Sequence, residues 1–145
     1  LEAARKRDIV IDRALITQLE GDIGTPEIGY IAAKKILEGG KTFTALFAFN
    51  DVSAIGAIRA LQEAGLRIPE DVSVLGFDDI YAAEFHNPAL TTIRQPLFEM
   101  GELAGKILLE ALSRTDTHGE KSQTLTVEPQ LIIRQSTASV SRSLA

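Results

Sequence analysis

The feature that most constrains the fold is a pair of apolar segments without polar alternation. Residues 44–49 and 72–77 read as short strands buried on both faces, because a strand with one face in water alternates apolar and polar residues. Helical patterns lie between and around these two segments. Strands that alternate with helices predict an α/β fold, a parallel sheet flanked by helices with right-handed crossovers.

Local signals mark the helices. One helix begins at Thr25-Pro26-Glu27, where a hydroxyl cap, a proline and an acid follow one another, and it ends at Gly39-Gly40. A second helix is capped by Asn50 or Asp51 and runs to about Ala64. The remaining predicted elements are a short apolar run over 14–19 that leads to Asp22, a short helix over 80–85, an extended segment over 90–94, an amphipathic helix over 97–113 and an extended segment over 125–133.

Charge and composition exclude several classes of protein. The chain has 145 residues, a net charge of -5 and no cysteine, so disulfide and thiolate chemistry are excluded. Its one basic cluster, Arg5-Lys6-Arg7, reads as the solvated end of a helix, whereas nucleic-acid binding needs a concentrated positive surface. No apolar run is long enough to span a bilayer. The opening Leu1-Glu2-Ala3-Ala4 reads like the middle of a helix, so we expect a piece of a longer protein.

Polar residues follow the predicted strands, at the edge where α/β sheets bind ligands. A carboxylate accepts hydrogen bonds from hydroxyl groups, and an amide both donates and accepts, which suits a sugar or another polar ligand. Ile23, Phe77 and Leu97 are candidate walls of such a pocket. The candidate polar residues are Asp22, Asn50, Asp51, Asp78, Asp79 and Gln95.

Helix capping and turn formation compete with ligand binding for most of these residues. Asp51 is favoured as the cap of the helix that follows it, and Asn50 is divided evenly between capping and binding. Asp79 is favoured as the cap of the short helix beginning near residue 80, and Asp22 has an alternative role in closing a turn. Asp78 is the strongest ligand candidate, because its neighbour can do the capping.

Catalytic patterns are missing from the sequence. There is no phosphate-binding loop, no dinucleotide fingerprint and no nucleophile elbow, and nothing pairs a nucleophile with a base. His86 and His118 lack metal-ligand spacing and read as surface residues. The sequence therefore predicts ligand binding without turnover, with no cofactor and no metal.

Five segments carry a specific order and spacing: FND at 49–51, AIGA at 54–57, GLRIPEDVSVLGFDD at 65–79, LTTIRQP at 90–96 and LIIRQST at 131–137. Together they resemble the LacI/GalR (lactose-repressor) family of bacterial transcription regulators, over nearly the whole chain. The resemblance implies a two-lobed core like that of periplasmic sugar-binding proteins (type I), preceded by a helix-turn-helix and a hinge. An effector bound between the lobes would alter the affinity for operator DNA.

By this resemblance, residues 1–136 are the carboxyl-terminal effector-binding lobe. They include a crossover segment over 93–123 that packs on the amino-terminal lobe, and residues 137–145 are a loose tail. The positions of Ile23 (next to Asp22), Asn50, Asp78 and Gln95 would contact the effector, expected to be a sugar or related metabolite. Sugar-binding members often have an aromatic residue where this chain has Ile23, and the family's upstream arginine contact is not in this chain.

The resemblance also implies a homodimer. In the helix over 51–64, Val52 and Ile55 lie nearly opposite the core face formed by Ala54, Ala57, Ile58 and Leu61. The alternative is that they are scattered surface apolar residues, which are common. The implied dimer contacts are Val52, Ile55, Tyr81, Phe85 and His86.

The helix over 97–113 would expose its apolar stripe without the amino-terminal lobe, so we expect it to fold against its own sheet or to exchange with another copy. The expected protein is a cytoplasmic regulator that reaches operator DNA only through a helix-turn-helix absent from this chain, with no membrane contact. The alternative is a periplasmic sugar-binding protein of an uptake system. A doubly wound enzyme is disfavoured, because no nucleophile or cofactor loop is present.

Overall fold

The computed structural model describes residues 2–18, 24–113 and 124–139. Its elements, in chain order, are α1 (Glu2–Arg5), the 3-10 helix η1 (Arg13–Leu15), α2 (Pro26–Glu38), β1 (Ala45–Phe47), α3 (Asp51–Glu63), β2 (Ser73–Leu75), α4 (Tyr81–Phe85), β3 (Thr92–Arg94), α5 (Leu97–Ser113) and β4 (Gln130–Ile132).

Two strand pairs make up the sheet. β1 pairs with β2 in parallel, and β3 pairs with β4 in antiparallel fashion. Parallel bridges from Leu75 to Thr91 and from Asp78 to Arg94 place β3 beside β2. The strand order is therefore β1-β2-β3-β4, and the carboxyl ends of β1, β2 and β3 lie at the same edge.

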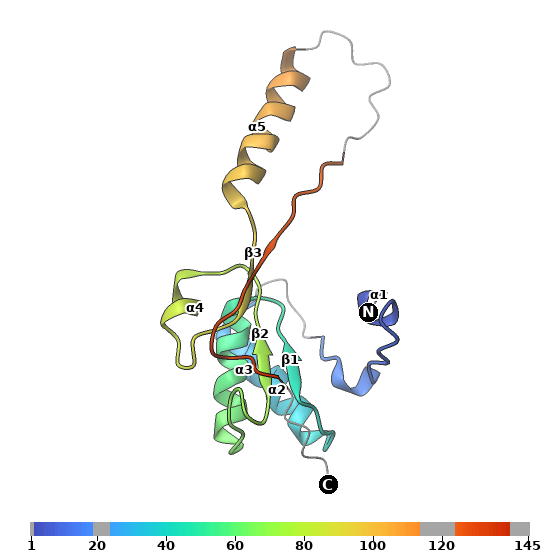
Figure 1. Ribbon diagram of the computed structural model, residues 1–145, viewed down its shortest axis with the longest axis vertical. Helices are drawn as coiled ribbons and strands as arrows, with labels where there is room; N and C mark the ends of the chain where they lie inside the picture. Colours follow the sequence, from blue (N-terminus) through green and yellow to red (C-terminus); the bar gives the residue numbers. More distant parts are fainter. Residues whose placement is uncertain (1, 19–23, 114–123, 140–145) are drawn as a thin grey trace.

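Helices α2 and α3 lie side by side along the strands (Figure 1). The predicted caps form at both helices: Thr25 Oγ1 accepts from Ile28 N (3.3 Å), and Asn50 Oδ1 accepts from Ser53 N (2.9 Å). Gly29 and Gly56 allow the two helices to approach closely. A Cβ on Gly29 would collide with the backbone of Ser53, and one on Gly56 with the backbone of Pro26.

The main core lies between α3 and the strands. Ile58 and Leu61 of α3, Val74 of β2 and Leu90 before β3 are fully buried. Ala54 and Ala57 are buried as well, so the core face predicted for this helix is confirmed.

The prediction that residues 44–49 are buried on both faces was wrong. β1 covers only three residues, and the exposed fractions of Phe47 and Phe49 are 64% and 76%. Leu46 packs against the core under α2 and α3, whereas no described residue covers the opposite face. The apolar run leading to Asp22 forms no strand over its described residues 14–18, since η1 occupies its start, capped by Asp12, and residues 16–18 are in no strand. Residue 19 lies outside the described residues.

Helix α5 projects away from the rest of the molecule (Figure 1). None of its residues is buried, and Leu108, Leu109 and Leu112 are more than half exposed. The first expected alternative, that this helix folds against its own sheet, is therefore wrong, because α5 leaves the sheet directly after β3. The other alternative, exchange with another copy, stays a prediction. Within the described ranges, no helix has the length and apolarity that a membrane crossing requires.

Both ends of the described chain agree in part with expectation. Arg5, Lys6 and Arg7 are exposed at the end of α1, where Lys6 pairs with Glu2. Thr137 and Ala138, assigned to the loose tail, are held by hydrogen bonds with Thr91 and Ser73. The remainder of that tail from residue 140, the crossover residues 114–123 and His118 lie outside the described residues.

Candidate functional site

The site is built where β1, β2 and β3 end. Asp51 N donates to Phe77 O (2.8 Å), so the start of α3 is attached to the segment that follows β2. Asp78 N donates to Ile93 O (2.9 Å), so this segment also runs beside β3. The structure thereby brings the segments that carry Asn50, Asp78 and Gln95 to one edge of the sheet. Asp22 and Ile23 lie outside the described residues.

Asp78 and Gln95 are in direct contact. Gln95 Nε2 donates to Asp78 Oδ1 at 2.7 Å, and both side chains are half-buried. Asp78 Oδ2 accepts no hydrogen bond from any residue that the structure describes. Among the described residues, the pair therefore leaves the second Asp78 carboxylate oxygen and the Gln95 amide oxygen without a hydrogen bond.

Asn50 can both cap the helix and bind a ligand, the two roles between which the sequence did not decide. Its Oδ1 caps α3, as described above, while its Nδ2 makes no hydrogen bond within the described ranges. Gly24 passes so close that a Cβ there would collide with the Asn50 amide. Asn50 can therefore donate to a ligand while it caps the helix.

Asp51 does not cap α3, and this prediction was wrong because Asn50 occupies the cap one residue earlier. The Asp51 side chain is fully buried; Oδ1 accepts from Thr92 Oγ1 (2.5 Å) and Oδ2 from Ile80 N (2.9 Å). Burial raises the pKa of this carboxyl, against the opposing effect of the two hydrogen bonds. A Cβ on Gly76 would collide with Asp51 Oδ1, so the glycine makes room for this acid.

Asp79 does not cap α4 either. Ile80 precedes that helix without any side-chain cap, whereas the Asp79 carboxylate is paired with two guanidinium groups. Arg94 Nε lies 2.6 Å from Asp79 Oδ2, and Arg134 Nη2 lies 2.7 Å from Asp79 Oδ1. Burial raises the pKa of Asp79, but the guanidinium groups of Arg134 and Arg94 outweigh it, so this pKa lies below its ordinary value.

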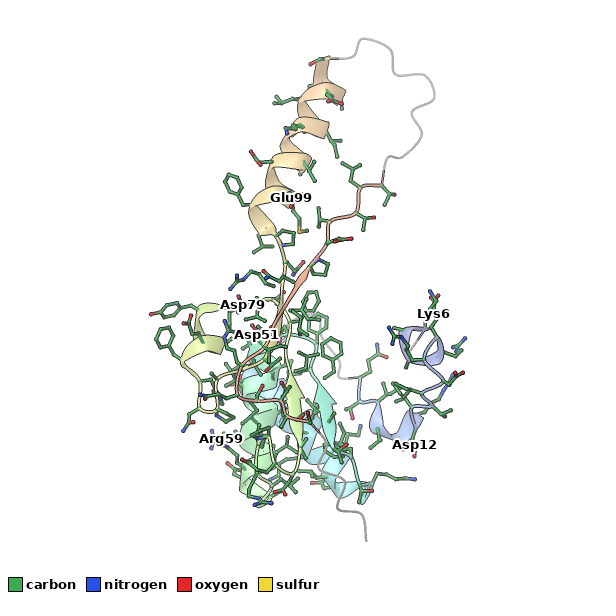
Figure 2. The ribbon with its side chains drawn as sticks, viewed as in Figure 1. Lys6, Asp12, Asp51, Arg59, Asp79 and Glu99 are labelled. Carbon is green, nitrogen blue, oxygen red and sulfur yellow. The ribbon has the colours of Figure 1, made fainter. Side chains whose placement is uncertain are left out.

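Figure 2 shows Asp51 and Asp79 near one another, at the end of the molecule from which α5 projects. Sequence reasoning missed three residues that support the site: Thr92, Arg94 and Arg134. Asp51 and Asp79 pointed to such residues, because an acid that is buried and caps no helix requires donors from elsewhere in the chain.

The two described candidates for the pocket walls are partly exposed to solvent. Phe77 is half-buried, and Leu97, the first residue of α5, is 64% exposed.

Of the predicted dimer contacts, Val52, Ile55 and His86 are half-buried, and Tyr81 and Phe85 are exposed. The Tyr81 and Phe85 rings stack on each other with centroids 4.7 Å apart.

Comparison with known proteins places this geometry in a family. Residues 12–137 match the model of the periplasmic binding protein-like domain. The chain belongs to that family. The predicted fold class is thereby confirmed, and so is the resemblance to LacI/GalR regulators, because the relatives carry that description.

One curated relative is the HTH-type transcriptional repressor PurR of Haemophilus influenzae. It is 46% identical over 115 residues, which cover 79% of this chain and 34% of the repressor. The chain thus spans about a third of the length of the curated relatives that it matches.

Solved structures agree with this placement. A putative LacI-family transcriptional regulator from Sanguibacter keddieii is 30% identical with a TM-score of 0.83, covering 95% of this chain and 50% of that one. The transcriptional regulator CelR in complex with cellobiose is 30% identical with a TM-score of 0.81, covering 93% of this chain and 39% of that one.

Proposed function

We propose that this chain is the carboxyl-terminal lobe of the effector-binding core of a LacI-type transcription regulator. In this proposal a small polar effector, a sugar or related metabolite, binds at Asp78, Gln95 and Asn50, with Asp22 and Ile23 beside them. The observation that carries the proposal is the Asp78–Gln95 pair, since it presents free polar atoms at the sheet edge where α/β folds bind ligands.

The chemistry at this edge is binding and not turnover. Its described polar side chains are carboxylates, amides, guanidinium groups and the Thr92 hydroxyl, and each buried acid is already committed to a structural partner. Hydroxyl-rich ligands are recognised by such acceptors and donors. The cellobiose complex of CelR supports a sugar as the ligand class.

A second lobe would complete the site. We propose that α5 packs on an amino-terminal lobe of a longer protein, which explains why its leucines are exposed in this chain. Operator DNA would be bound by a helix-turn-helix outside this chain, and the whole protein would act in the cytoplasm, as a transcription regulator. The regulators among the relatives support this proposal over a periplasmic uptake protein.

A homodimer is part of the proposal. Val52 and Ile55 on α3, together with the stacked Tyr81 and Phe85 on α4, would form the contact surface, with His86 at its edge. Exposed aromatic residues of this kind are enriched at the centres of protein interfaces.

The test is Asp78→Asn in a longer protein that contains this chain. Asn tolerates the positive φ of Asp78 (109°) and keeps the side-chain shape, but it replaces an anionic acceptor by a neutral amide. A hydrogen bond to a charged group contributes about 1.5–3 kcal/mol, so we expect affinity for the effector to fall by about tenfold or more.

Thermal shift measurements with a panel of sugars and nucleobases identify the ligand first, because a ligand that binds the folded state raises the unfolding temperature. The control is Asp71→Asn, which removes a carboxylate bonded to Arg67 and lies away from the sheet edge. A ligand that shifts wild type and Asp78→Asn equally would refute the assignment of Asp78.

A further inference from the structure

Two consecutive non-glycine residues at the site have a left-handed backbone. The φ angles of Asp78 and Asp79 are 109° and 55°. Residues with a Cβ rarely adopt this region, and they remain there only when surrounding contacts hold them. The contacts that hold this pair therefore determine where the Asp78 carboxylate points.

The strongest of those contacts are made by Asp79. Its side chain is 6% exposed, and each carboxylate oxygen faces one guanidinium group, Arg94 on one side and Arg134 on the other. We call these three residues the Asp79 cluster. Arg94 Nε donates a hydrogen bond to Asp79 Oδ2 at 2.6 Å, and hydrogen bonds to charged groups are shorter and stronger than neutral ones. Arg134 Nη2 lies 2.7 Å from Asp79 Oδ1 as an ion pair without hydrogen-bond geometry.

Both arginines are fixed to the sheet. Arg94 is the last residue of β3, and its backbone forms a parallel bridge with Asp78. Arg134 follows β4, is 14% exposed, and donates a hydrogen bond from Nη1 to Leu90 O (2.9 Å). Asp79 is therefore paired with two arginines whose backbones are anchored to the strands, and Arg134 is further held by its bond to Leu90 O.

The residues on either side of Asp79 are held as well. Asp78 N donates to Ile93 O, and Ile80 N donates to the buried Asp51 carboxylate. In this short segment only the Asp78 side chain is directed at another candidate effector residue, Gln95.

We propose that Asp79 is a positioning residue: its ion pairs with Arg94 and Arg134 hold Asp78 in the left-handed conformation that brings its carboxylate to Gln95. Asp79 itself contacts no effector. The inference rests on the proposed function for its biological meaning, because Asp78 is the effector residue there. The geometry it describes exists without an effector and can be measured in the free protein.

The competing account is that the Asp79 cluster only ties β3 to β4. In that case its loss lowers stability and leaves the Asp78–Gln95 hydrogen bond intact in the molecules that remain folded. The side-chain amide of Gln95 separates the two accounts, because its Nε2 protons report directly on that hydrogen bond.

The experiment is nuclear magnetic resonance on the 145-residue chain, labelled with nitrogen-15 in glutamine. Asp78→Ala removes the acceptor and gives the reference signal of an unbonded Gln95 amide. Asp79→Asn keeps the shape of the side chain and removes its charge. Asp71→Asn is the control, since Asp71 is also a carboxylate paired with a guanidinium group, that of Arg67, at a distant position.

We expect Asp79→Asn to shift the Gln95 amide signals toward those of Asp78→Ala and to speed their exchange with water by about tenfold, as expected for loss of one hydrogen bond. Asp71→Asn should leave both unchanged. A folded Asp79→Asn variant with wild-type Gln95 signals overturns the proposal.

If Asp79→Asn fails to fold, the same measurement on Arg94→Met tests the proposal. The Arg94 side chain is 52% exposed, so this change removes one guanidinium partner without emptying a buried position. An intermediate shift of the Gln95 signals supports the proposal, and unchanged signals overturn it. Neither result depends on an effector, so failure here is distinct from failure of Asp78→Asn to lower effector affinity.

Discussion

Asp51 and Asp79 are two acids at one edge of the sheet with opposite pKa shifts. The donors to Asp51 are a hydroxyl and a backbone N–H, which stabilise a carboxylate less than a guanidinium does, so burial dominates and raises its pKa. Asp79 has two guanidinium partners, and its pKa is lowered. At the scale of the single residue, the type of donor determines the direction of the shift.

The raised pKa of Asp51 makes a prediction for Asp51→Asn. Above the unfolded value of about 3.8, the folded protein retains the Asp51 proton longer than the unfolded chain does. The contribution of Asp51 to stability is therefore lost as pH rises through its folded pKa. Because Asn does not ionise, the free energy of unfolding of Asp51→Asn should rise relative to that of wild type as pH increases from the unfolded to the folded pKa of Asp51.

Urea unfolding of both proteins at a series of pH values from about 3.5 to 7 measures this difference. A stability difference between Asp51→Asn and wild type that stays constant with pH would contradict the prediction. Asp79→Asn should show the opposite trend, because the pKa of Asp79 is lowered.

The positions of these acids could be predicted from the sequence, but their roles could not. Helix capping is a local preference, and it was correct for Thr25 and available for Asn50. The partner of Asp51 is Thr92, 41 positions away, and Arg134 is still further from Asp79 along the chain. Only the sheet brings these residues together, so no spacing rule in the sequence indicates them.

At the scale of elements, the contact between α2 and α3 depends on two glycines. Gly29 and Gly56 each face the backbone of the other helix at a point where no Cβ fits. By contrast, Gly101 and Gly105 of α5 have no atom within 4 Å of a built Cβ. The same residue type therefore has a packing role in one pair of helices and none in the other helix.

We expect Gly56→Ala to lower the free energy of unfolding by roughly 1–3 kcal/mol, as is typical of an overpacked contact. Gly29→Ala should have a similar effect, because it meets the same interface from the other side. Gly105→Ala is the control: it should raise helicity in α5, since alanine is favoured over glycine by about 1 kcal/mol in helices.

Urea unfolding followed by circular dichroism measures both effects. A Gly56→Ala protein as stable as wild type would show that the helices separate without cost. A loss of stability in Gly105→Ala would show that α5 has a packing partner.

Helices were easier to predict than strands in this chain. The bounds of α2 and α3 follow from caps and stops within the segments themselves, at Thr25, Gly39 and Asn50. The burial of β1 depends on what covers its second face, which its own residues do not encode, and Phe47 is exposed although it lies in an apolar run. The same dependence explains α5, whose apolar stripe was predicted but whose packing was not.

At the scale of the whole molecule, the open apolar surfaces include two on helices, in addition to the uncovered face of β1 at Phe47 and Phe49. One is α5, with its exposed leucines, and the other is the Tyr81–Phe85 pair of α4. Contiguous exposed apolar side chains favour association. The two surfaces lie on different elements, so substitutions can separate them.

We expect the isolated chain to associate with rising concentration through both surfaces. Leu108→Lys with Leu112→Lys should remove the part due to α5, and adding Tyr81→Ala with Phe85→Ala should remove the part due to α4. Lysine is a good helix former, so α5 itself should persist. Sedimentation analysis gives the distribution of species.

The matched control is Glu102→Gln with Glu110→Gln on α5, which changes the net charge by the same +2 without altering a leucine. If this control dissociated the chain as much as the lysine variant did, net charge rather than the apolar stripe would be the cause. An unchanged distribution in the lysine variant would contradict the role of α5.

Ser136 has a consequence for the order in which the lobe is made. It is fully buried, donates from Oγ to Val74 O (2.6 Å) and accepts from Thr91 N (2.8 Å), across 62 and 45 positions of sequence. Contacts this distant slow folding, because a long loop must close before they form. During synthesis, the contacts of Ser136 with Val74 and Thr91 therefore cannot form until the segment after α5 has emerged. We expect a nascent chain that stalls before β4 to expose that edge and to depend on chaperones until translation resumes.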